Sequence, residues 1–259
     1  MSRGFRSPLR VSLTLGSLLL GSLLQGCKPA DESKLAAAGT HHALRRITTL
    51  EVPASSDTSS NSNSAHGSVD SLQAKVSLAL EQGDFVAAVK DLEHLAELKP
   101  QDEEVFFNLG YAHTRARQTN EAIRSYVRCL DLLPTYAEAH NNLGNLLLSQ
   151  KRFPEAEVHF RAALTNQPEN SLTYNNLGKW HAVQSRPQEG IPLFREAIRL
   201  NPKNWEARHN LAVAYLTLGM LEESRAELKM IVDENPEMAI ARKTLSRVES
   251  LRQGRSGTR

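Results

Sequence analysis

Residues 136–148 read Tyr-Ala-Glu-Ala-His-Asn-Asn-Leu-Gly-Asn-Leu-Leu-Leu and contain an Asn-Leu-Gly core that recurs along the chain. The same tripeptide occupies 108–110 and 176–178, and Asn-Leu-Ala occupies 210–212, so each step is 34 residues. Five prolines keep this step: Pro100, Pro134, Pro168, Pro202 and Pro236. An unbroken period of this length is typical of a repeat solenoid, in which each unit buries its apolar face only against its neighbours.

The repeat predicts two helices in every unit. With position 1 at Val69, Glu103, Ala137, Ser171 and Trp205, position 8 is Gly or Ala in the last four units and position 20 is Ala in the first three. Position 24 is aromatic in the middle three units: Tyr126, Phe160 and Phe194. Small residues at 8 and 20 let two helix axes approach closely, and large residues interdigitate between them. The proline at position 32 is expected to end each second helix.

This pattern of Leu-Gly, Ala, aromatic and Pro resembles the tetratricopeptide repeat family over roughly residues 69–252. The resemblance implies an all-α fold, a right-handed superhelical solenoid of about five helix pairs with a C-terminal capping helix. We place the solenoid at 68–252, its capping helix at 237–252 and a disordered tail at 253–259. Ala241, Leu245 and Val248 form the apolar stripe of that last helix.

The amino terminus has the three parts of a signal peptide. Residues 1–10 carry three arginines and no acid, and the apolar run from Val11 to Leu24 is shorter than the ~20 residues of a membrane-spanning helix. The run ends in Leu24-Gln25-Gly26-Cys27, which resembles the lipobox of bacterial lipoproteins, although Gln25 departs from the usual small residue. The resemblance implies removal of residues 1–26, acylation of Cys27 and sorting to the outer membrane, with the soluble part facing the periplasm.

The segment from the cysteine to the first repeat, 27–67, loses all periodicity. Residues 54–68 are almost entirely Ser, Asn, Thr, Asp, Ala and Gly, a composition that buries too little apolar surface to order itself. We therefore expect a lipidated, disordered tether. Removal of the leader would leave 28 basic against 29 acidic residues, a formal net charge of −1. A nearly neutral chain without a basic run has no electrostatic basis for nucleic-acid binding.

Candidate ligand contacts lie on the first helix of each unit. The resemblance implies that positions 5, 6 and 9 of this helix face a concave groove. Here they carry an unusual number of asparagines, and a carboxamide offers the donor and acceptor that an extended peptide backbone requires. The pattern is similar to the asparagine ladder of the protein O-linked N-acetylglucosamine transferases. The predicted peptide-binding groove comprises Asn108, Tyr111, Asn141, Asn142, Asn145, Asn175, Asn176, Lys179 and Asn210.

Other ligands were weighed against a peptide. The carboxylate clamp of chaperone-binding repeats needs several groove cations, whereas this groove has mainly Arg115 and Lys179, with acids at position 2. A glycan-binding module would use Trp180, Tyr111 and Tyr174 with the asparagines. The asparagines would also suit a purely structural spacer, if they bond only within the protein.

Catalysis is not expected. The nine histidines are scattered, no glycine-rich phosphate loop or nucleophile elbow occurs, and Cys129 replaces the alanine of neighbouring units as a small buried thiol. We therefore expect no catalytic residue, metal or cofactor. The sequence predicts an exported scaffold, lipid-anchored at Cys27, that binds a protein or peptide partner in envelope assembly, in the pilus or secretion, outer-membrane or cell-wall machinery. It leaves the partner and the oligomeric state open.

Overall fold

The computed structural model describes residues 63–256, which form helices joined by short turns, with no strand among them. They divide into two compact units, 63–180 and 181–256, called here the N-terminal and C-terminal units. The predicted signal peptide, Cys27 and most of the predicted tether lie outside the described residues. Between residues 63 and 256, no helix combines the length and apolarity needed to cross a membrane.

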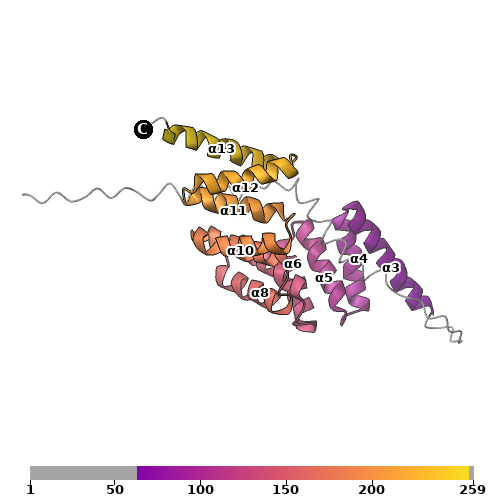
Figure 1. Ribbon diagram of the computed structural model, residues 1–259. Coiled ribbons are helices and arrows are strands. Elements are labelled where there is room, and N and C mark those ends of the chain that lie inside the picture. The colour runs from indigo at the N-terminus through magenta and orange to yellow at the C-terminus, as the bar shows by residue number, and fades with distance from the viewer. Residues whose placement is uncertain (1–62, 257–259) are drawn as a thin grey trace, which may run out of the picture. The chain divides into compact units, whose positions relative to one another are not determined.

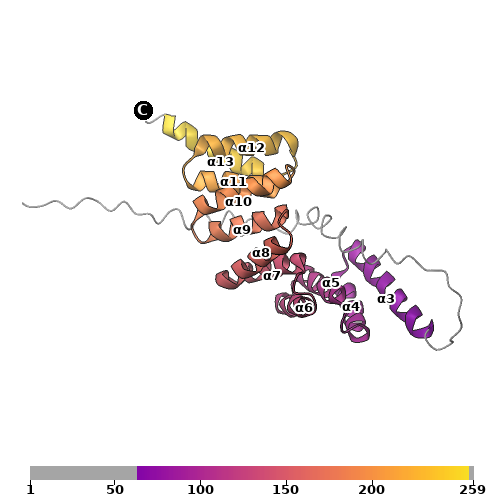
Figure 2. The ribbon, with the colours of Figure 1, turned by 60° about the horizontal axis from the view of Figure 1, so that its bottom comes forward.

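The helices follow the 34-residue period (Figures 1 and 2). The N-terminal unit contains α3 (Asn63–Gln82), α4 (Phe85–Leu98), α5 (Glu103–Arg115), α6 (Thr119–Leu132), α7 (Ala137–Ser149) and α8 (Phe153–Asn166). The boundary between the units falls inside α9 (Ser171–Val183), after Trp180. The C-terminal unit continues with α10 (Pro187–Leu200), α11 (Trp205–Thr217), α12 (Leu221–Glu234) and α13 (Ala239–Ser256). The prediction of an all-α helical solenoid is confirmed.

The repeat prolines set the ends of the second helices as predicted. The helices α4, α6, α8, α10 and α12 each end two residues before a repeat proline, because proline disfavours the helical conformation of the preceding residue. At the other end, Asp102 caps α5: its Oδ1 accepts from the backbone N–H groups of Glu104 at 3.1 Å and Val105 at 3.3 Å. This capping satisfies donors that have no partner inside the helix.

The turn inside each helix pair depends on one residue in the left-handed region. Gly83, Arg117, Lys151, Ser185 and Gly219 have φ between 61° and 75° and are 34 residues apart. The turn after α7 shows the pattern, with Lys151 N–H donating to the Leu148 carbonyl at 3.0 Å and Arg152 N–H to the Leu147 carbonyl at 2.9 Å. Glycine adopts this conformation without strain, whereas the three other residues do so against their intrinsic preference.

The predicted packing of small against large residues is confirmed. A Cβ atom added to Gly144 would lie 2.7 Å from the Phe160 ring, and one added to Gly110 would lie 2.8 Å from the Tyr126 ring. Both rings are fully buried. In the last unit Ala212 replaces the glycine, and the residue at position 24 is Leu228 instead of an aromatic. The helix pair thus requires a matched combination at positions 8 and 24.

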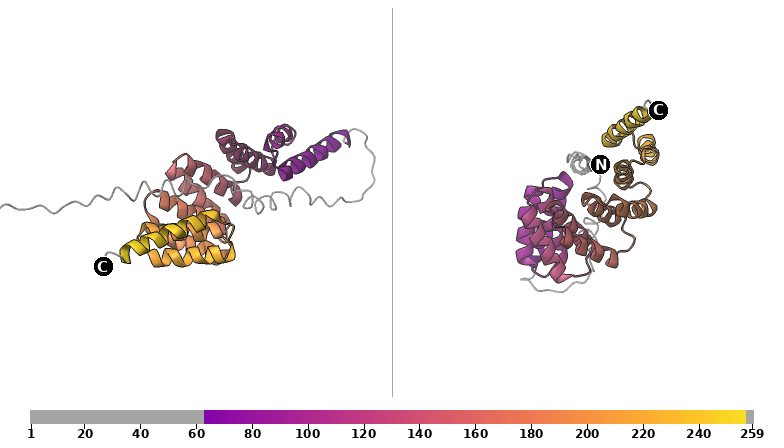
Figure 3. Two further views of the ribbon diagram at one scale, coloured as in Figure 1. Left: turned by 90° about the horizontal axis from the view of Figure 1, so that it is seen from above. Right: turned by 90° about the vertical axis from the view of Figure 1, so that its left-hand side faces the viewer.

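The last helix closes the C-terminal unit as predicted. Ala241 and Val248 are fully buried against α11 and α12, with Leu245 packed beside them. Figure 3 shows α12, in gold, beside α13, in yellow, from two further directions.

The predicted helix boundaries need correction at both ends of the solenoid. The first helix begins at Asn63 and not at 68, and the last runs from Ala239 to Ser256 and not from 237 to 252. Residues 253–256 are therefore helical and not part of a disordered tail. Apolar periodicity marks only the packed part of a helix, so it does not report where an exposed end extends beyond that part. Pro192 also lies within the continuous helix α10, where it removes one backbone N–H donor.

Candidate functional site

The predicted groove residues differ in their access to solvent. We call the surface formed by positions 2, 5, 6 and 9 of α5, α7 and α9 up to Trp180 the first-helix face. Four of the nine predicted groove residues are half-buried on this face: Tyr111, Asn142, Asn145 and Lys179. The other five are buried: Asn108, Asn141, Asn175 and Asn176 in the N-terminal unit, and Asn210 in the C-terminal unit.

Two of the buried asparagines join successive first helices. The Asn176 Nδ2 group of α9 donates to the Asn141 Oδ1 atom of α7 at 2.9 Å, in a site closed to solvent. A buried hydrogen bond of this kind contributes about 0.5–1.5 kcal/mol, and leaving one partner unpaired costs more. Asn141 and Asn176 therefore stabilise the stacking of successive repeats. The sequence predicted both as ligand contacts in an open groove, whereas in the structure both side chains are buried and bonded to each other.

Asn142 and Asn145 occupy the more accessible part of α7. Asn142 Nδ2 donates to the Tyr126 hydroxyl at 3.2 Å, and its Oδ1 lies 3.5 Å from Asn141 Nδ2. Burial raises the pKa of Tyr126 well above its ordinary value, so this hydroxyl stays neutral. The Asn145 side chain makes no hydrogen bond within residues 63–256. The pair thus leaves amide groups available on the surface one helical turn apart.

The aromatic residues on this face and beside it are engaged within the protein. The Tyr111 hydroxyl accepts from Arg115 Nη1 at 3.0 Å, and the Arg115 guanidinium lies 4.5 Å from the centroid of the Phe85 ring. Trp180 is only 5% exposed, and its indole Nε1 donates to the Phe153 carbonyl at 2.7 Å. A carboxylate clamp would need Arg115, and a sugar-stacking platform would need the Trp180 ring. The arrangement favours neither.

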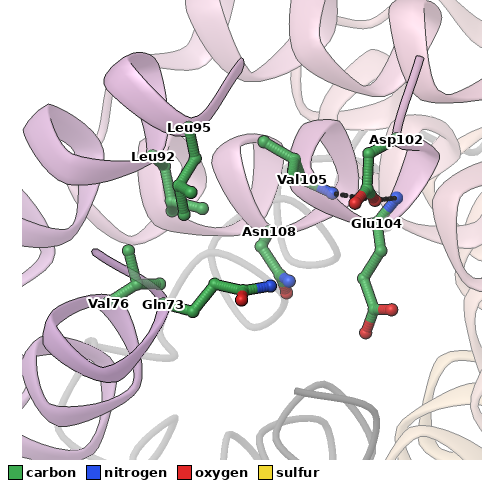
Figure 4. Close-up of a pocket in the computed structure, with 8 residues that line it drawn as sticks. All are labelled: Gln73, Val76, Leu92, Leu95, Asp102, Glu104, Val105 and Asn108. Carbon is green, nitrogen blue, oxygen red and sulfur yellow. Dashed lines mark hydrogen bonds between the residues drawn. The ribbon is translucent and has the colours of Figure 1, made fainter. Parts of the chain in front are cut away.

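Asn108 lies on α5 at the edge of a cavity between α3, α4 and α5 (Figure 4). The side chain is 2% exposed, and its Oδ1 atom has no hydrogen-bond partner. A buried acceptor without a partner costs about 1–3 kcal/mol, so this atom is the exception among the buried asparagines.

A pair of contacting histidines, His140 and His159, was not predicted from the sequence. His140 on α7 and His159 on α8 face each other with their Nδ1 atoms 2.9 Å apart, and His140 Nε2 lies 3.0 Å from the Pro134 carbonyl. The carbonyl can only accept, so His140 carries a proton on Nε2, and the Nδ1–Nδ1 contact requires one of the two rings to donate and the other to accept. Burial and the neighbouring His140 lower the pKa of His159. The two histidines are 19 residues apart, so only a register of α7 against α8 would have revealed them.

No group of three or more metal-ligating side chains occurs among the described residues. Cys129 is fully buried, and burial raises the pKa of its thiol to about 12. The thiol is therefore protonated at neutral pH and behaves as the small core residue that the sequence predicted. In the C-terminal unit, burial lowers the pKa of His209 to about 4, and its Nε2 lies 3.1 Å from the Thr244 hydroxyl.

Comparison with protein families gives three matches to the tetratricopeptide repeat. Separate family models match residues 74–129, 137–170 and 184–248, and together they cover more than half of the chain. Comparison with curated protein sequences gives no match.

Solved structures of similar fold are numerous. PilF of Pseudomonas aeruginosa is 20% identical with a TM-score of 0.64, over 74% of this chain and 88% of that one. MamA of Desulfovibrio magneticus RS-1 is 17% identical with a TM-score of 0.59, over 66% and 97% of the two chains. YrrB, described as a tetratricopeptide repeat protein with an unusual peptide-binding site, is 22% identical with a TM-score of 0.52, over 63% and 84%. At these identities the likeness concerns the fold alone.

The 34-residue period, the helix pairs that follow it and the three family matches lead to one conclusion. The chain belongs to the tetratricopeptide repeat family.

Proposed function

We propose that this protein is a non-catalytic scaffold whose first-helix face binds an extended segment of a protein partner. The observation that carries the proposal is the pair Asn142 and Asn145. Both are half-buried, and the Asn145 side chain has no hydrogen bond within the described residues. A carboxamide at the surface offers one acceptor and two donors, which suit the alternating C=O and N–H groups of an extended backbone.

The neighbouring contacts give this face the rigidity that recognition requires. The Asn176–Asn141 bond fixes the spacing of α7 and α9, and Tyr126 holds Asn142 in place. A surface held in its binding conformation loses less entropy on association. The description of YrrB, a protein of similar fold, names a peptide-binding site, which agrees with a peptide ligand here.

The alternatives that the sequence left open have less support. A glycan module would use the Trp180 ring, but this ring is buried and its N–H is bonded to a carbonyl. A pure spacer would need no accessible amides, whereas Asn142 and Asn145 present them.

We further propose that acylation of Cys27 anchors the scaffold to the outer membrane, facing the periplasm, where it serves envelope assembly. The basis is the sequence before the described residues: three arginines, an apolar run and the Leu24-Gln25-Gly26-Cys27 motif. Several acyl chains on one residue would give stable membrane binding, which a single chain does not.

Position-resolved photo-crosslinking in intact cells tests the binding face. A crosslinking amino acid replaces Asn145 or, as the control, Val158, which is 65% exposed on the second helix of the same repeat. We expect a covalent partner from position 145, joined through one continuous segment of the partner, and none from position 158. Equal crosslinking from both positions, or none from position 145, contradicts the proposal.

A further inference from the structure

His140 and His159 occupy two repeat positions at which the helices of a pair face each other. His140 is at position 4 of its repeat and His159 is at position 23. The same two positions hold Arg208 and Glu227 in the last repeat, where Arg208 Nη1 lies 2.8 Å from Glu227 Oε2. The remaining repeats carry Leu72 with Asp91, Phe106 with Ser125, and Tyr174 with Leu193. The five repeats thus use five different pairs here, so packing alone does not require two imidazoles.

The two imidazole nitrogen atoms are spaced like two ligands of one metal ion. His140 Nδ1 and His159 Nδ1 lie 2.9 Å apart. Bonds from a metal to imidazole are about 2.0–2.1 Å long, so two ligands at a right angle place their nitrogen atoms about 2.9 Å apart. Square-planar and tetragonal sites, which have such angles, are typical of Cu²⁺ and Ni²⁺. An N–H···N hydrogen bond has a similar length, so the surroundings of the rings decide between the two.

The surroundings of the rings favour a metal ion. His140 Nε2 lies 3.0 Å from the Pro134 carbonyl, and metal-binding histidines commonly donate their second N–H to a carbonyl in this way. Burial and the neighbouring His140 lower the pKa of His159, so this ring is neutral and does not repel a cation. Arg152 and Glu155, the other charged groups that act on His159, pair with each other at 2.7 Å. Both histidines are half-buried, so water can reach the site.

We propose that the Nδ1 atoms of His140 and His159 bind a divalent transition-metal ion of the Cu²⁺ or Ni²⁺ type. The proton between the two atoms then moves to Nε2 of His159, so the neutral pair releases no proton. Water molecules complete the coordination. The ion joins α7 to α8, which lie side by side in Figure 2. The site forms only in the folded chain, so metal binding stabilises the fold, and it does not depend on a peptide partner.

Urea unfolding of the full chain, followed by circular dichroism, tests the site with NiCl₂ or with EDTA. We expect about 1 mM nickel to raise the ratio of folded to unfolded chain at least about tenfold, which corresponds to a dissociation constant of about 0.1 mM or lower. Nickel that binds the folded and unfolded chain equally does not change this ratio. The measurement therefore reports only sites that depend on the fold.

Variants assign the nickel effect to the histidine pair. His159→Gln removes one ligand, keeps a polar side chain and is expected to lose the effect. His140→Phe/His159→Ser reproduces the Phe106 and Ser125 pair of the second repeat, so it should fold without metal and not respond to nickel. The matched control is His94→Gln, which removes an exposed histidine of α4 and should keep the full effect.

Three results overturn the inference. The first is an unfolding curve of the parent chain that nickel does not shift, in which case the contact is a hydrogen bond only. The second is an equal nickel effect in the parent and in His140→Phe/His159→Ser, which would place the ion elsewhere. The third is an equal loss of the effect in His159→Gln and His94→Gln.

Discussion

Substituting Gly144 by alanine tests whether the contact between positions 8 and 24 sets the spacing of the helix pair. The new Cβ would lie 2.7, 2.9 and 3.1 Å from three carbons of the Phe160 ring, where ordinary contacts are 3.4–4 Å. Phe160 is fully buried, so the ring must move by about 0.7 Å against a packed core. Overpacking of this kind costs about 2–3 kcal/mol, and the better helix propensity of alanine returns about 1. We expect a net loss of about 1–2 kcal/mol.

The assay is urea unfolding followed by circular dichroism, with the midpoint and the slope measured together. The variant Gly144→Ala/Phe160→Leu reproduces the combination found at Ala212 and Leu228 in the last unit. It should be more stable than the sum of the two single losses predicts, because each change accommodates the other. Gly254→Ala is the control: it adds a Cβ in open space on α13 and should not destabilise. A Gly144→Ala variant as stable as the parent, or strictly additive losses in the double variant, would refute the reasoning.

Three further outcomes follow from the structure. Lys151→Gly should raise the free energy of unfolding by about 0.5–1 kcal/mol, because Lys151 has φ 61°, a left-handed conformation that glycine adopts without strain. Lys151→Ala is the control, and an equal gain in stability there would contradict the explanation. Burial lowers the pKa of His209 to about 4, although the Glu206 carboxylate acts in the opposite direction. A histidine in the unfolded chain titrates near 6.5. As the pH falls, the unfolded chain therefore binds a proton at His209 before the folded chain does, and about 3 kcal/mol of stability should be lost between pH 6.5 and 4. In unfolding curves measured over this pH range, His209→Gln should reduce the dependence of stability on pH. An unchanged dependence would count against the assignment. Cys27→Ala should release the protein from the membrane fraction, and a variant that still sediments with the outer membrane argues against lipid anchoring.

Much of the fold could be predicted because the 34-residue period expresses the packing rules directly. The prolines give the ends of the second helices, and the glycine at position 8 indicates the close approach that the Gly144–Phe160 contact shows. The left-handed turn was less visible. Glycine marks it at Gly83 and Gly219, but Arg117, Lys151 and Ser185 carry no sign of the same conformation.

The candidate site could be predicted only in part. The sequence brings the asparagines to equivalent positions of successive helices, but it does not say how far each side chain is covered by the next repeat. The side chains of Asn141 and Asn176 bond to each other, whereas the side chain of Asn145, four residues after Asn141 on α7, makes no hydrogen bond within the described residues. The Asn108 Oδ1 atom has no hydrogen-bond partner, and it lies beside a cavity formed by three helices. The shape of such a cavity cannot be predicted from the residue types at equivalent repeat positions.

The most direct test of the central claim, that the first-helix face binds an extended partner segment, is an affinity comparison. The segment identified by crosslinking is synthesised as a peptide and titrated calorimetrically into the full chain, Asn145→Arg and Val158→Arg. Arginine at 145 replaces an accessible amide and blocks the face, whereas arginine at 158 adds the same charge on α8 outside it. The account predicts at least about tenfold weaker binding for Asn145→Arg and parental affinity for Val158→Arg. Parental affinity in Asn145→Arg, or equal losses in both variants, would contradict it.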